Sequence, residues 1–299
     1  MIEQHPPILI VPVKPTAAAD RARLLAALSQ LAAADAAPEV SIDEETGGIL
    51  LGAMSERDLG GCVGRLTTNY SLRLDIGAPQ VAYRETIAAS IVIDHTHKKT
   101  AGGANQFARV KISFELGEPG REASFSSRLA PGSLSPPEFA RGVEAGVMYA
   151  FGSGIIAGFP VYGVTAALLD GAFHDTDSSK VAFEITGRAA AREALARGGA
   201  VLLEPMMRVE IQCDGESASG IAADLKLRRG EIWKQRPQDG AIAIGATAPL
   251  ANLLGYVNSL ARLSQGRASF EMTFSHYAAM PGGDGGDDPG FRPAAAMRA

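Results

Sequence analysis

Apolar positions in residues 1–76 switch twice between strand-like and helix-like spacing. Residues 8–14 (ILIVPVK) are a β-branched run that predicts a strand, and leucines at helical spacing then predict a helix capped by Thr16. Those leucines occupy positions 24, 25, 28 and 31. The segments EVSID and GGILLGA predict two further strands joined by a turn.

A second helix follows these strands. Ser55 is placed to cap it, with Asp58 at the capping-box position, and Leu59, Val63 and Leu66 form its apolar stripe. The segment SLRLDI predicts a closing strand. The order of elements is therefore β-α-β-β-α-β, the arrangement of a ferredoxin-like split βαβ unit.

The same order returns in residues 201–280. MMRVEIQC predicts a strand, Ser217 opens a helix, and EIWKQ and GAIAIGATA predict two more strands. Pro249 marks the start of a helix whose apolar residues keep a 3.6-residue period as far as Gly266, and RASFEMTF closes the unit. Two similar α+β units are thus expected on either side of a different middle segment.

The middle segment, residues 77–200, is expected to mix strands and helices in another order. One helix is predicted to start at Ser135, with Pro136 at its first position, and another follows the stretch HDTDSS. Its strands are predicted near 81–97, 106–129 and 160–170. The tail, residues 281–299, is rich in Gly, Pro and Asp and is expected to be disordered.

Composition narrows the functional classes. The 299 residues are 46% hydrophobic and carry a formal net charge of −5, so any contact with RNA must come from a local basic patch. Cys62 and Cys213 are the only cysteines, which makes no disulfide framework or zinc motif and suits a reducing cytosol. Apolar runs stay below the roughly 18 residues that a membrane span needs, so we expect a cytoplasmic protein without membrane contact.

Four separated segments, in the same order, resemble elongation factor G. They are GAPQVAYRET (77–86), HDTDSS (174–179), LLEPMMRVEI (202–211) and GYVNSLARLSQGRASFEMTF (255–274). The resemblance covers about residues 8–277 and corresponds to the third, fourth and fifth domains of that family. It leaves out the first two, one of which is the GTPase domain, and the sequence contains no G-x-x-x-x-G-K-[ST] loop. We therefore expect either a truncated form or a separately encoded half.

The resemblance implies three domains and an α+β fold. Residues 1–76 correspond to domain III and residues 201–280 to domain V, both ferredoxin-like. Residues 77–200 correspond to domain IV, a ribosomal protein S5-like finger. In the family the end of this finger enters the decoding centre of the small ribosomal subunit during tRNA–mRNA translocation.

Two stretches resemble the loops at the end of that finger. The first is HDTDSS, in which the resemblance places His174 at the tRNA–mRNA region, together with Asp175 and Asp177. The second is TAGGANQFA (100–108), where a glycine pair lets the backbone approach RNA closely. The residues expected to contact RNA from this second stretch and its flank are Lys98, Lys99, Gly102, Gly103, Asn105 and Gln106.

A local excess of positive charge surrounds the second stretch. Between positions 94 and 111 Asp94 is the only acid, and the cluster contains two histidines and four cations. They are His95, His97, Lys98, Lys99, Arg109 and Lys111. This cluster would allow phosphate contact at one end of an otherwise acidic protein.

Other interpretations of these residues are simpler. Asp177 or Ser178 is expected to cap the following helix whether or not His174 contacts RNA. His174, Asp175 and Asp177 lack the spacing of a metal site, and His95 and His97 are more consistent with an exposed polar strand face. Residues 152–157 (GSGIIA) match G-x-G-x-x-A but follow a helical segment, so a helix-to-strand loop is expected instead of a dinucleotide site.

Two departures from the family pattern suggest a divergent paralogue. The second helix of the first unit contains Gly60, Gly61 and Gly64, each costing roughly 1 kcal/mol against alanine. Ala104 also stands where the family favours an arginine or similar residue, although Asn105 can still donate hydrogen bonds to RNA.

The function expected from the resemblance is a ribosome-binding module of a translational GTPase, without bond-making chemistry of its own. Its partners would be ribosomal RNA, the tRNA–mRNA complex at the A site, and a GTPase domain in the same or another chain. We expect a monomer with no cofactor on this chain, since GTP and Mg²⁺ belong to the absent domain. The alternatives are a ribosomal-protection protein of the tetracycline-resistance type and, from another class, a free-standing interaction or oligomerisation protein.

Overall fold

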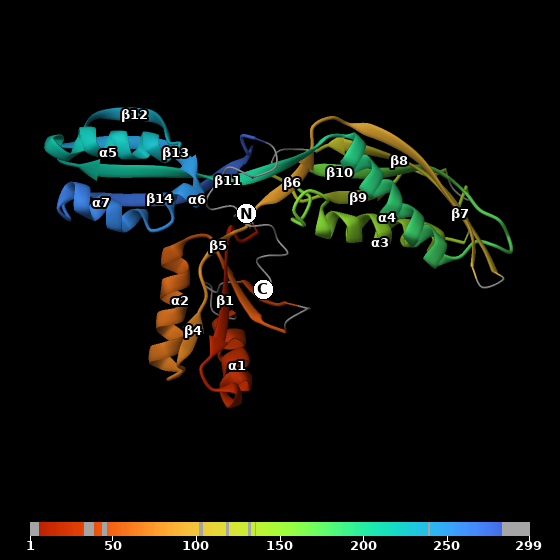
Figure 1. The fold of residues 1–299 in the computed structure, drawn as a ribbon, viewed down its shortest axis with the longest axis horizontal. Coiled ribbons are helices and arrows are strands. Elements are labelled where there is room, and N and C mark those ends of the chain that lie inside the picture. The colour runs from red at the N-terminus through yellow and green to blue at the C-terminus, as the bar shows by residue number, and fades with distance from the viewer. Residues whose placement is uncertain are drawn as a thin grey trace.

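Three β-sheets organise the part of the chain that the structure describes, and we call the parts built on them the first, middle and third units (Figure 1). The structure is a computed structural model, and it describes residues 6–32, 39–43, 47–101, 104–117, 120–130, 133–134, 136–238 and 240–282. The middle and third units lie along the longest axis of the molecule, and the first unit lies below the region where they meet (Figure 1). Most of the tail that was expected to be disordered, from residue 283 onward, falls outside the described residues.

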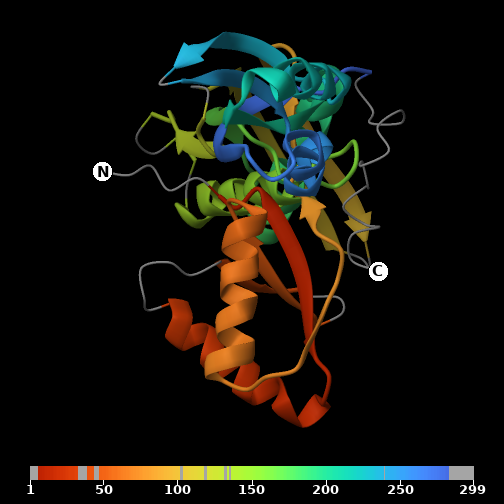
Figure 2. The same cartoon turned by 90° about the vertical axis from the view of Figure 1, so that its left-hand side faces the viewer.

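The first unit has the ferredoxin-like strand order β2-β3-β1-β4, and β5 adds to β1. Its strands are β1 (Leu9–Pro15), β2 (Glu39–Ile42), β3 (Ile49–Ala53), β4 (Leu74–Ile76) and β5 (Gln80–Val81). Three helical segments lie against this sheet (Figure 2): the short 3₁₀ turn Ala18–Asp20, α1 (Arg21–Ala32) and α2 (Glu56–Asn69). Helix α2 runs without interruption through its three glycines.

One helix cap in the first unit is confirmed and another is wrong. The hydroxyl of Ser55 accepts a hydrogen bond from the backbone N–H of Asp58 at 3.2 Å, as the capping box predicts. Thr16 does not cap α1, because its hydroxyl donates to the carbonyl oxygen of Arg73 at 2.9 Å. This bond ties the end of β1 to the segment that leads into β4.

The middle unit has a sheet of order β7-β8-β10-β9, in which β9 runs parallel to β10. Its strands are β7 (Ile91–Ala101), β8 (Ala104–Leu116), β9 (Ser124–Ser127) and β10 (Val164–Ala172). Helices α3 (Glu138–Ser153) and α4 (Lys180–Arg197) cover it. Helix α3 begins at Glu138, three residues later than predicted, and the expected first residue, Ser135, is not among the described residues.

Glycines bring α3 and α4 into backbone contact. A methyl group on Gly146 would overlap the carbonyl oxygen of Glu184, and one on Gly187 would lie 2.5 Å from the carbonyl oxygen of Val143. Because each glycine faces the opposite helix, the two backbones can approach more closely than helices separated by larger side chains. The sheet, these helices and their buried alanines form one core.

The third unit repeats the strand order of the first, as β12-β13-β11-β14, and the short strand β6 (Arg84–Ile87) adds to β11. Its strands are β11 (Ala200–Cys213), β12 (Glu231–Gln238), β13 (Ala241–Pro249) and β14 (Ser269–Ala279). Its helices are α5 (Gly215–Leu227), α6 (Leu250–Leu253) and α7 (Tyr256–Ser264). The α+β fold class predicted from the sequence is therefore confirmed.

Two helix starts in the third unit differ from the prediction. The cap of α5 is Asp214, whose carboxylate accepts from the N–H of Ser217, and this bond together with Arg267 lowers the pKa of Asp214 to about 2. The single helix expected after Pro249 is broken at Gly255, which has φ +68. The break turns Tyr256 into the core and leaves Val257 53% exposed, although the 3.6-residue period placed Val257 on the apolar face.

The first and third units share one apolar cluster. It contains residues of both sheets and also Tyr83 and Phe159, whose rings lie 5.4 Å apart at the junction of the three units. Backbone N–H of Gly255 also donates to the carboxylate of Glu56 in the first unit at 3.1 Å. Among the described residues, no helix is long and apolar enough to cross a membrane.

The glycine contact between α3 and α4 makes a testable prediction about stability. We expect Gly146→Ala to lower the free energy of unfolding by about 1–3 kcal/mol, because the added methyl group forces the helices apart. Gly152→Ala in the same helix is the matched control, since a methyl group there meets no atom within 4 Å. That control should be neutral or stabilise by up to about 1 kcal/mol in urea denaturation. Equal effects of the two substitutions would contradict the interlocked packing.

Candidate nucleic-acid interface

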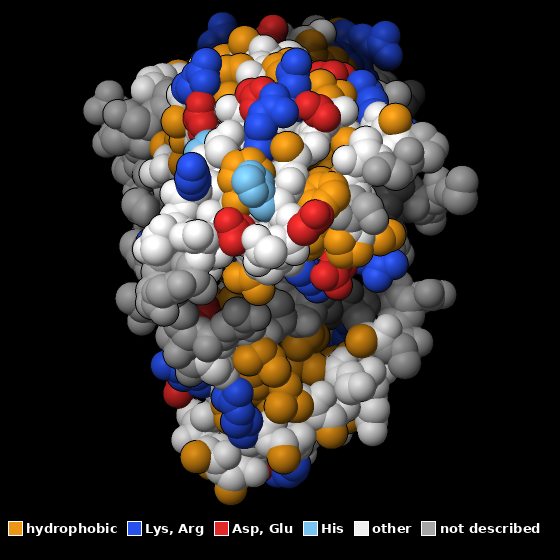
Figure 3. Space-filling model, turned by 90° about the vertical axis from the view of Figure 1, so that its right-hand side faces the viewer, with side chains coloured by type: hydrophobic (Ala, Val, Ile, Leu, Met, Phe, Trp, Pro, Cys, Tyr) orange, Lys and Arg blue, Asp and Glu red, His pale blue; other side chains and the backbone are white. Residues whose placement is uncertain are grey.

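Two loops that are far apart in the sequence meet at one end of the middle unit. We call this end the tip, and it comprises residues 97–101, 104–107 and 173–179. Phe107 on β8 donates its backbone N–H to the carbonyl oxygen of Asp177 at 2.9 Å, and its own carbonyl accepts from the hydroxyl of Ser178 at 2.7 Å. The two loops of the tip are therefore joined by hydrogen bonds to the backbone of Phe107, at the end of the molecule that Figure 3 faces.

His174 is exposed and rests against Phe107. The centroids of the two rings lie 4.3 Å apart, with 59° between their planes. The backbone N–H of His174 donates to the hydroxyl of Ser178 at 2.9 Å, so Ser178 connects His174 to Phe107. An exposed imidazole on a braced backbone can stack on a base or donate a hydrogen bond to RNA.

Neither Asp177 nor Ser178 caps α4, contrary to the prediction. The cap is Ser179, whose hydroxyl accepts from the N–H of Ala182 at 3.1 Å. Ser178 is already bonded to Phe107, and the carboxylate of Asp177 accepts from the hydroxyl of Thr176 at 3.1 Å. Three neighbouring residues had suitable side chains, and the distant strand β8 decided which of them was left for the helix.

On the hairpin side of the tip, polar side chains of β7 and β8 form hydrogen bonds with each other. His97 lies 3.1 Å from the amide oxygen of Gln106, and Thr100 donates to the amide oxygen of Asn105 at 2.9 Å. Because both amide oxygens are used inside the hairpin, the amide nitrogens remain as donors for an external acceptor. Gly102 and Gly103, predicted to approach RNA, lie outside the described residues.

Part of the positive cluster expected around this hairpin is paired with acidic side chains. Arg109 forms ion pairs with Asp94 and Asp170, and its hydrogen bond with Asp94 raises its pKa further. Nδ1 of His95 lies 3.0 Å from the carboxylate of Glu193 on α4. Hydrogen bonds with Arg197, and to a smaller extent with His95, lower the pKa of Glu193. The charge of Arg109 is therefore compensated within the unit, and His95 is held against Glu193.

Lys98 and Lys99 are exposed on the hairpin side of the tip, and Asp175 is exposed on the neighbouring loop. Histidine, basic and acidic side chains share the face shown in Figure 3 with apolar ones. This mixture suits a few specific contacts better than general electrostatic attraction. Among the described residues no group of three or more His, Cys, Asp or Glu side chains could hold a metal ion.

Two residues of the tip were missed by the sequence analysis. Phe107 lay within the stretch 100–108 but was given no role, and Ser178 was treated as a possible cap, although together they join the loops. Phe107 is half-buried in the structure, which the sequence of the hairpin did not reveal. Nothing in the local sequence indicated which distant carbonyl Ser178 would bind.

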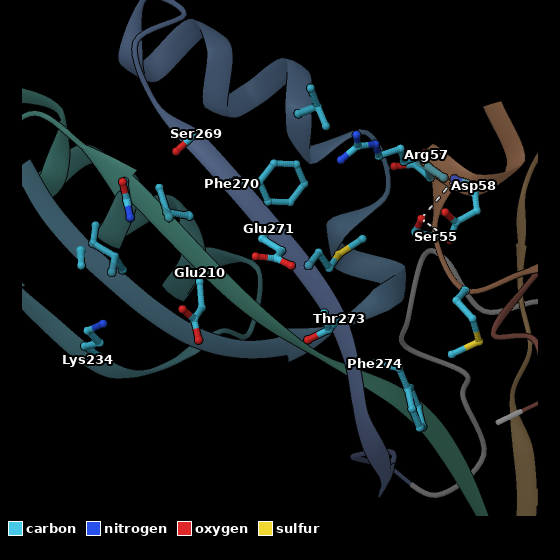
Figure 4. Close-up of a pocket in the computed structure, with 18 of the residues that line it drawn as sticks. Ser55, Arg57, Asp58, Glu210, Lys234, Ser269, Phe270, Glu271, Thr273 and Phe274 are labelled. Carbon is cyan, nitrogen blue, oxygen red and sulfur yellow. Dashed lines mark hydrogen bonds between the residues drawn. The ribbon is translucent and has the colours of Figure 1, made fainter. Parts of the chain in front are cut away.

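A separate hollow of 1290 Å³ lies between the first and third units. Figure 4 shows Ser55, Arg57 and Asp58 at the start of α2 across this hollow from Phe270 and Glu271 of β14. The tip and β14 lie at opposite ends of the molecule (Figure 1). The hollow is therefore a feature of the contact between units and is distinct from the tip.

The assignment of the cap predicts three different responses to alanine. Ser179→Ala should destabilise the protein by about 1 kcal/mol, the usual cost of losing an N-cap. Ser178→Ala should speed hydrogen exchange at the amide of His174, because its acceptor is removed. Asp177→Ala should change stability by no more than about 0.5 kcal/mol, since its carbonyl rather than its carboxylate binds Phe107. Thermal melts and amide exchange test all three, and a cost for Asp177→Ala equal to that of Ser179→Ala would show that Asp177 is the cap.

Comparisons with known proteins agree with this architecture. Family models match elongation factor G domain III over residues 5–78, domain IV over 79–199, and the elongation factor G C-terminus over 201–284. The chain is 46% identical over 275 residues to elongation factor G of Paracoccus denitrificans and equally to that of Cereibacter sphaeroides. In both comparisons the match covers 92% of this chain and 39% of the relative, so the chain spans well under half of the relatives' length.

A solved structure supports the same relationship. A crystal structure of a protein from Thermus thermophilus matches 93% of this chain and 41% of its own chain, with a TM-score of 0.69 and 32% identity. The three family models follow each other in order and together span nearly the whole sequence. The chain therefore belongs to the elongation factor G family, of which it carries domains III and IV and the C-terminal domain.

Proposed function

We propose that this chain is the ribosome-binding C-terminal module of an elongation factor G-like translational GTPase. Its tip would enter the decoding centre of the small subunit during tRNA–mRNA translocation or ribosome recycling. The observation that carries the proposal is the bonding of two distant loops at Phe107, which presents exposed His174 beside the hairpin of Lys98 and Lys99. Family membership supports a role in translation.

The proposed role is mechanical and does not include catalysis on this chain. The tip has the chemistry of a contact surface, with amide donors, two cations and a ring that can stack on a base. Turnover of GTP, with Mg²⁺, would come from a GTPase domain in the same or another chain. We further propose that the module acts as a monomer in the cytoplasm, with ribosomal RNA and the tRNA–mRNA complex as its partners.

A rigid middle unit suits this role. The tip is braced at Phe107, and behind it the glycine contacts lock α3 against α4. A stiff element transmits a displacement at its base to its end, whereas a flexible one would absorb it. The cost of ordering the tip is then met during folding and not at the moment of binding.

Ribosome binding is expected to weaken as salt rises, through a small number of contacts between cations and phosphates. Co-sedimentation of the 299-residue chain with ribosomes should weaken as salt rises, because cations that contact phosphates displace counterions. Replacing Lys98 and Lys99 by alanine should reduce the slope of log affinity against log salt by about 1 for each lysine that binds a phosphate. Lys14→Ala with Arg73→Ala, which removes two exposed cations from the first unit, is the charge-matched control and should change the slope less. Binding that is insensitive to salt would indicate an apolar protein partner instead.

His174→Ala should leave the fold intact and weaken binding. Removing an exposed loop side chain costs stability by no more than roughly 0.5 kcal/mol. Loss of a base stack would lower affinity by about 1–3 kcal/mol, and chemical protection of decoding-centre nucleotides should disappear with it. His276→Ala removes an exposed histidine from β14 and serves as the control. If His174→Ala melts the unit, the residue is structural, and if it binds and protects like the parent, the tip has another role.

A further inference from the structure

The loop that resembles a phosphate-binding motif encloses a carboxylate of the same chain. Residues 155–159, which follow α3, point five backbone N–H groups at Glu85. Oε2 accepts from Ile155 at 2.6 Å and Ile156 at 2.9 Å, and Oε1 accepts from Ala157 at 2.9 Å, Gly158 at 3.1 Å and Phe159 at 3.2 Å. Consecutive N–H groups of this kind form a concave site for an anion, and here the anion is Glu85.

The loop is shaped around this carboxylate. Glu85 is fully buried, at 0% exposure, so its charge depends on the amides that surround it. Gly154 has φ +50, and a methyl group there would overlap both the carboxyl carbon of Glu85 and the carbonyl oxygen of Phe159. Gly158, with φ +84, provides the second turn of the loop. Glycine is needed at Gly154 because the backbone passes so close to the carboxylate.

The backbone of Glu85 also joins two units. It lies on β6, opposite Leu202 of β11 at the base of the third unit's sheet. Its N–H donates to the carbonyl oxygen of Pro160 at 3.0 Å, and its carbonyl accepts from Tyr162 at 2.7 Å, both in the segment that leads into β10. One residue therefore holds a strand of the third unit and the base of the middle unit with backbone and side chain together.

The enclosed loop inserts side chains into the core shared by the first and third units. Phe159 packs on Tyr83, and both rings belong to that shared cluster, with Ile156 packed against it. Tyr277 of β14 lies beside Tyr162 and donates its hydroxyl to the carbonyl of Ala82 at 2.9 Å. Burial raises the pKa of Tyr277 to about 12, so this donor keeps its proton at neutral pH. The position of the loop thus affects how all three units meet.

We propose that Glu85 is the positioning residue that sets the direction of the middle unit relative to the third, by serving as the internal anion of loop 155–159. A carboxylate that accepts from five amides at once permits one loop conformation, whereas an apolar side chain would leave those amides without acceptors. The geometry concerns the free chain and does not require a ribosome. Its consequence for the reach of the tip rests on the proposed function.

Distance measurements between the two units test the proposal. Spin labels at Arg192→Cys on α4 and Ala223→Cys on α5 occupy exposed positions in the middle and third units. The native Cys62 and Cys213 are buried, and burial raises the pKa of both thiols, so they should remain unlabelled. The parent chain should give one narrow distance, and Glu85→Ala should lose it, giving a broad or displaced distribution.

Chemical rescue with acetate tests whether loss of the carboxylate causes the change in distance. Glu85→Ala removes a CH₂–COO⁻ group, which acetate closely reproduces, so acetate should restore the narrow distance while chloride at equal ionic strength should not. Glu85→Gln is the second variant if Glu85→Ala fails to fold. Its amide NH₂ opposes the loop N–H groups while filling the same space, so it should lose the narrow distance without responding to acetate.

The control is another buried carboxylate that lies within one unit. Glu204 is 2% exposed and pairs with Arg229, both in the third unit, so Glu204→Gln should lower the melting temperature and keep the narrow distance. A narrow, parental distance in Glu85→Ala or Glu85→Gln would overturn the proposal, as would equal restoration by acetate and chloride. These results are independent of ribosome co-sedimentation, so failure of the parent chain to bind ribosomes would reject the proposed function and leave this inference standing.

Discussion

The carboxylate of Glu85 inside its ring of backbone N–H groups is the interaction on which the arrangement of the three units depends. The side chain is buried and accepts hydrogen bonds from five backbone amides. The backbone of Glu85 lies in β6, which pairs with β11, and also bonds to Pro160 and Tyr162, which precede β10. Phe159 and Tyr83 then complete the apolar cluster that the first and third units share. A buried charge is tolerated only where polar groups surround it, so the loop and the carboxylate have to form together.

The tip is built on the same principle at the opposite end of the middle unit. There the backbone of Phe107 exchanges hydrogen bonds with the loop of Asp177 and Ser178, and the imidazole of His174 rests on the ring of Phe107. Between these two points the glycines of α3 and α4 allow direct backbone contact. At both ends of the unit, side-chain oxygens bond to backbone groups: the carboxylate of Glu85 to the amides of residues 155–159, and the hydroxyl of Ser178 to the carbonyl of Phe107.

Two side chains of the cluster expected to be positive, Arg109 and His95, have acidic partners within the middle unit. Arg109 pairs with Asp94 and Asp170, and His95 lies against Glu193, whereas Lys98 and Lys99 of β7 are exposed. On an acidic protein, the exposed lysines of this hairpin would offer local sites for contact with phosphate. This distribution of charge is consistent with the contact between the tip and RNA that is proposed for this chain.

Local patterns in the sequence were sufficient for the α+β class, for the repeated β-α-β-β-α-β order and for the capping box at Ser55, because each depends on residues close together along the chain. Resemblance to a family, and not periodicity, pointed to His174 and the hairpin. Tertiary structure decided the rest. Ser179 caps α4 because Ser178 is bonded to β8, and the helix after Pro249 breaks at Gly255 because Tyr256 is needed in the core. Residues 155–159 enclose Glu85 because a strand about 70 positions earlier brings a carboxylate to their amides, and no local pattern contains that distance.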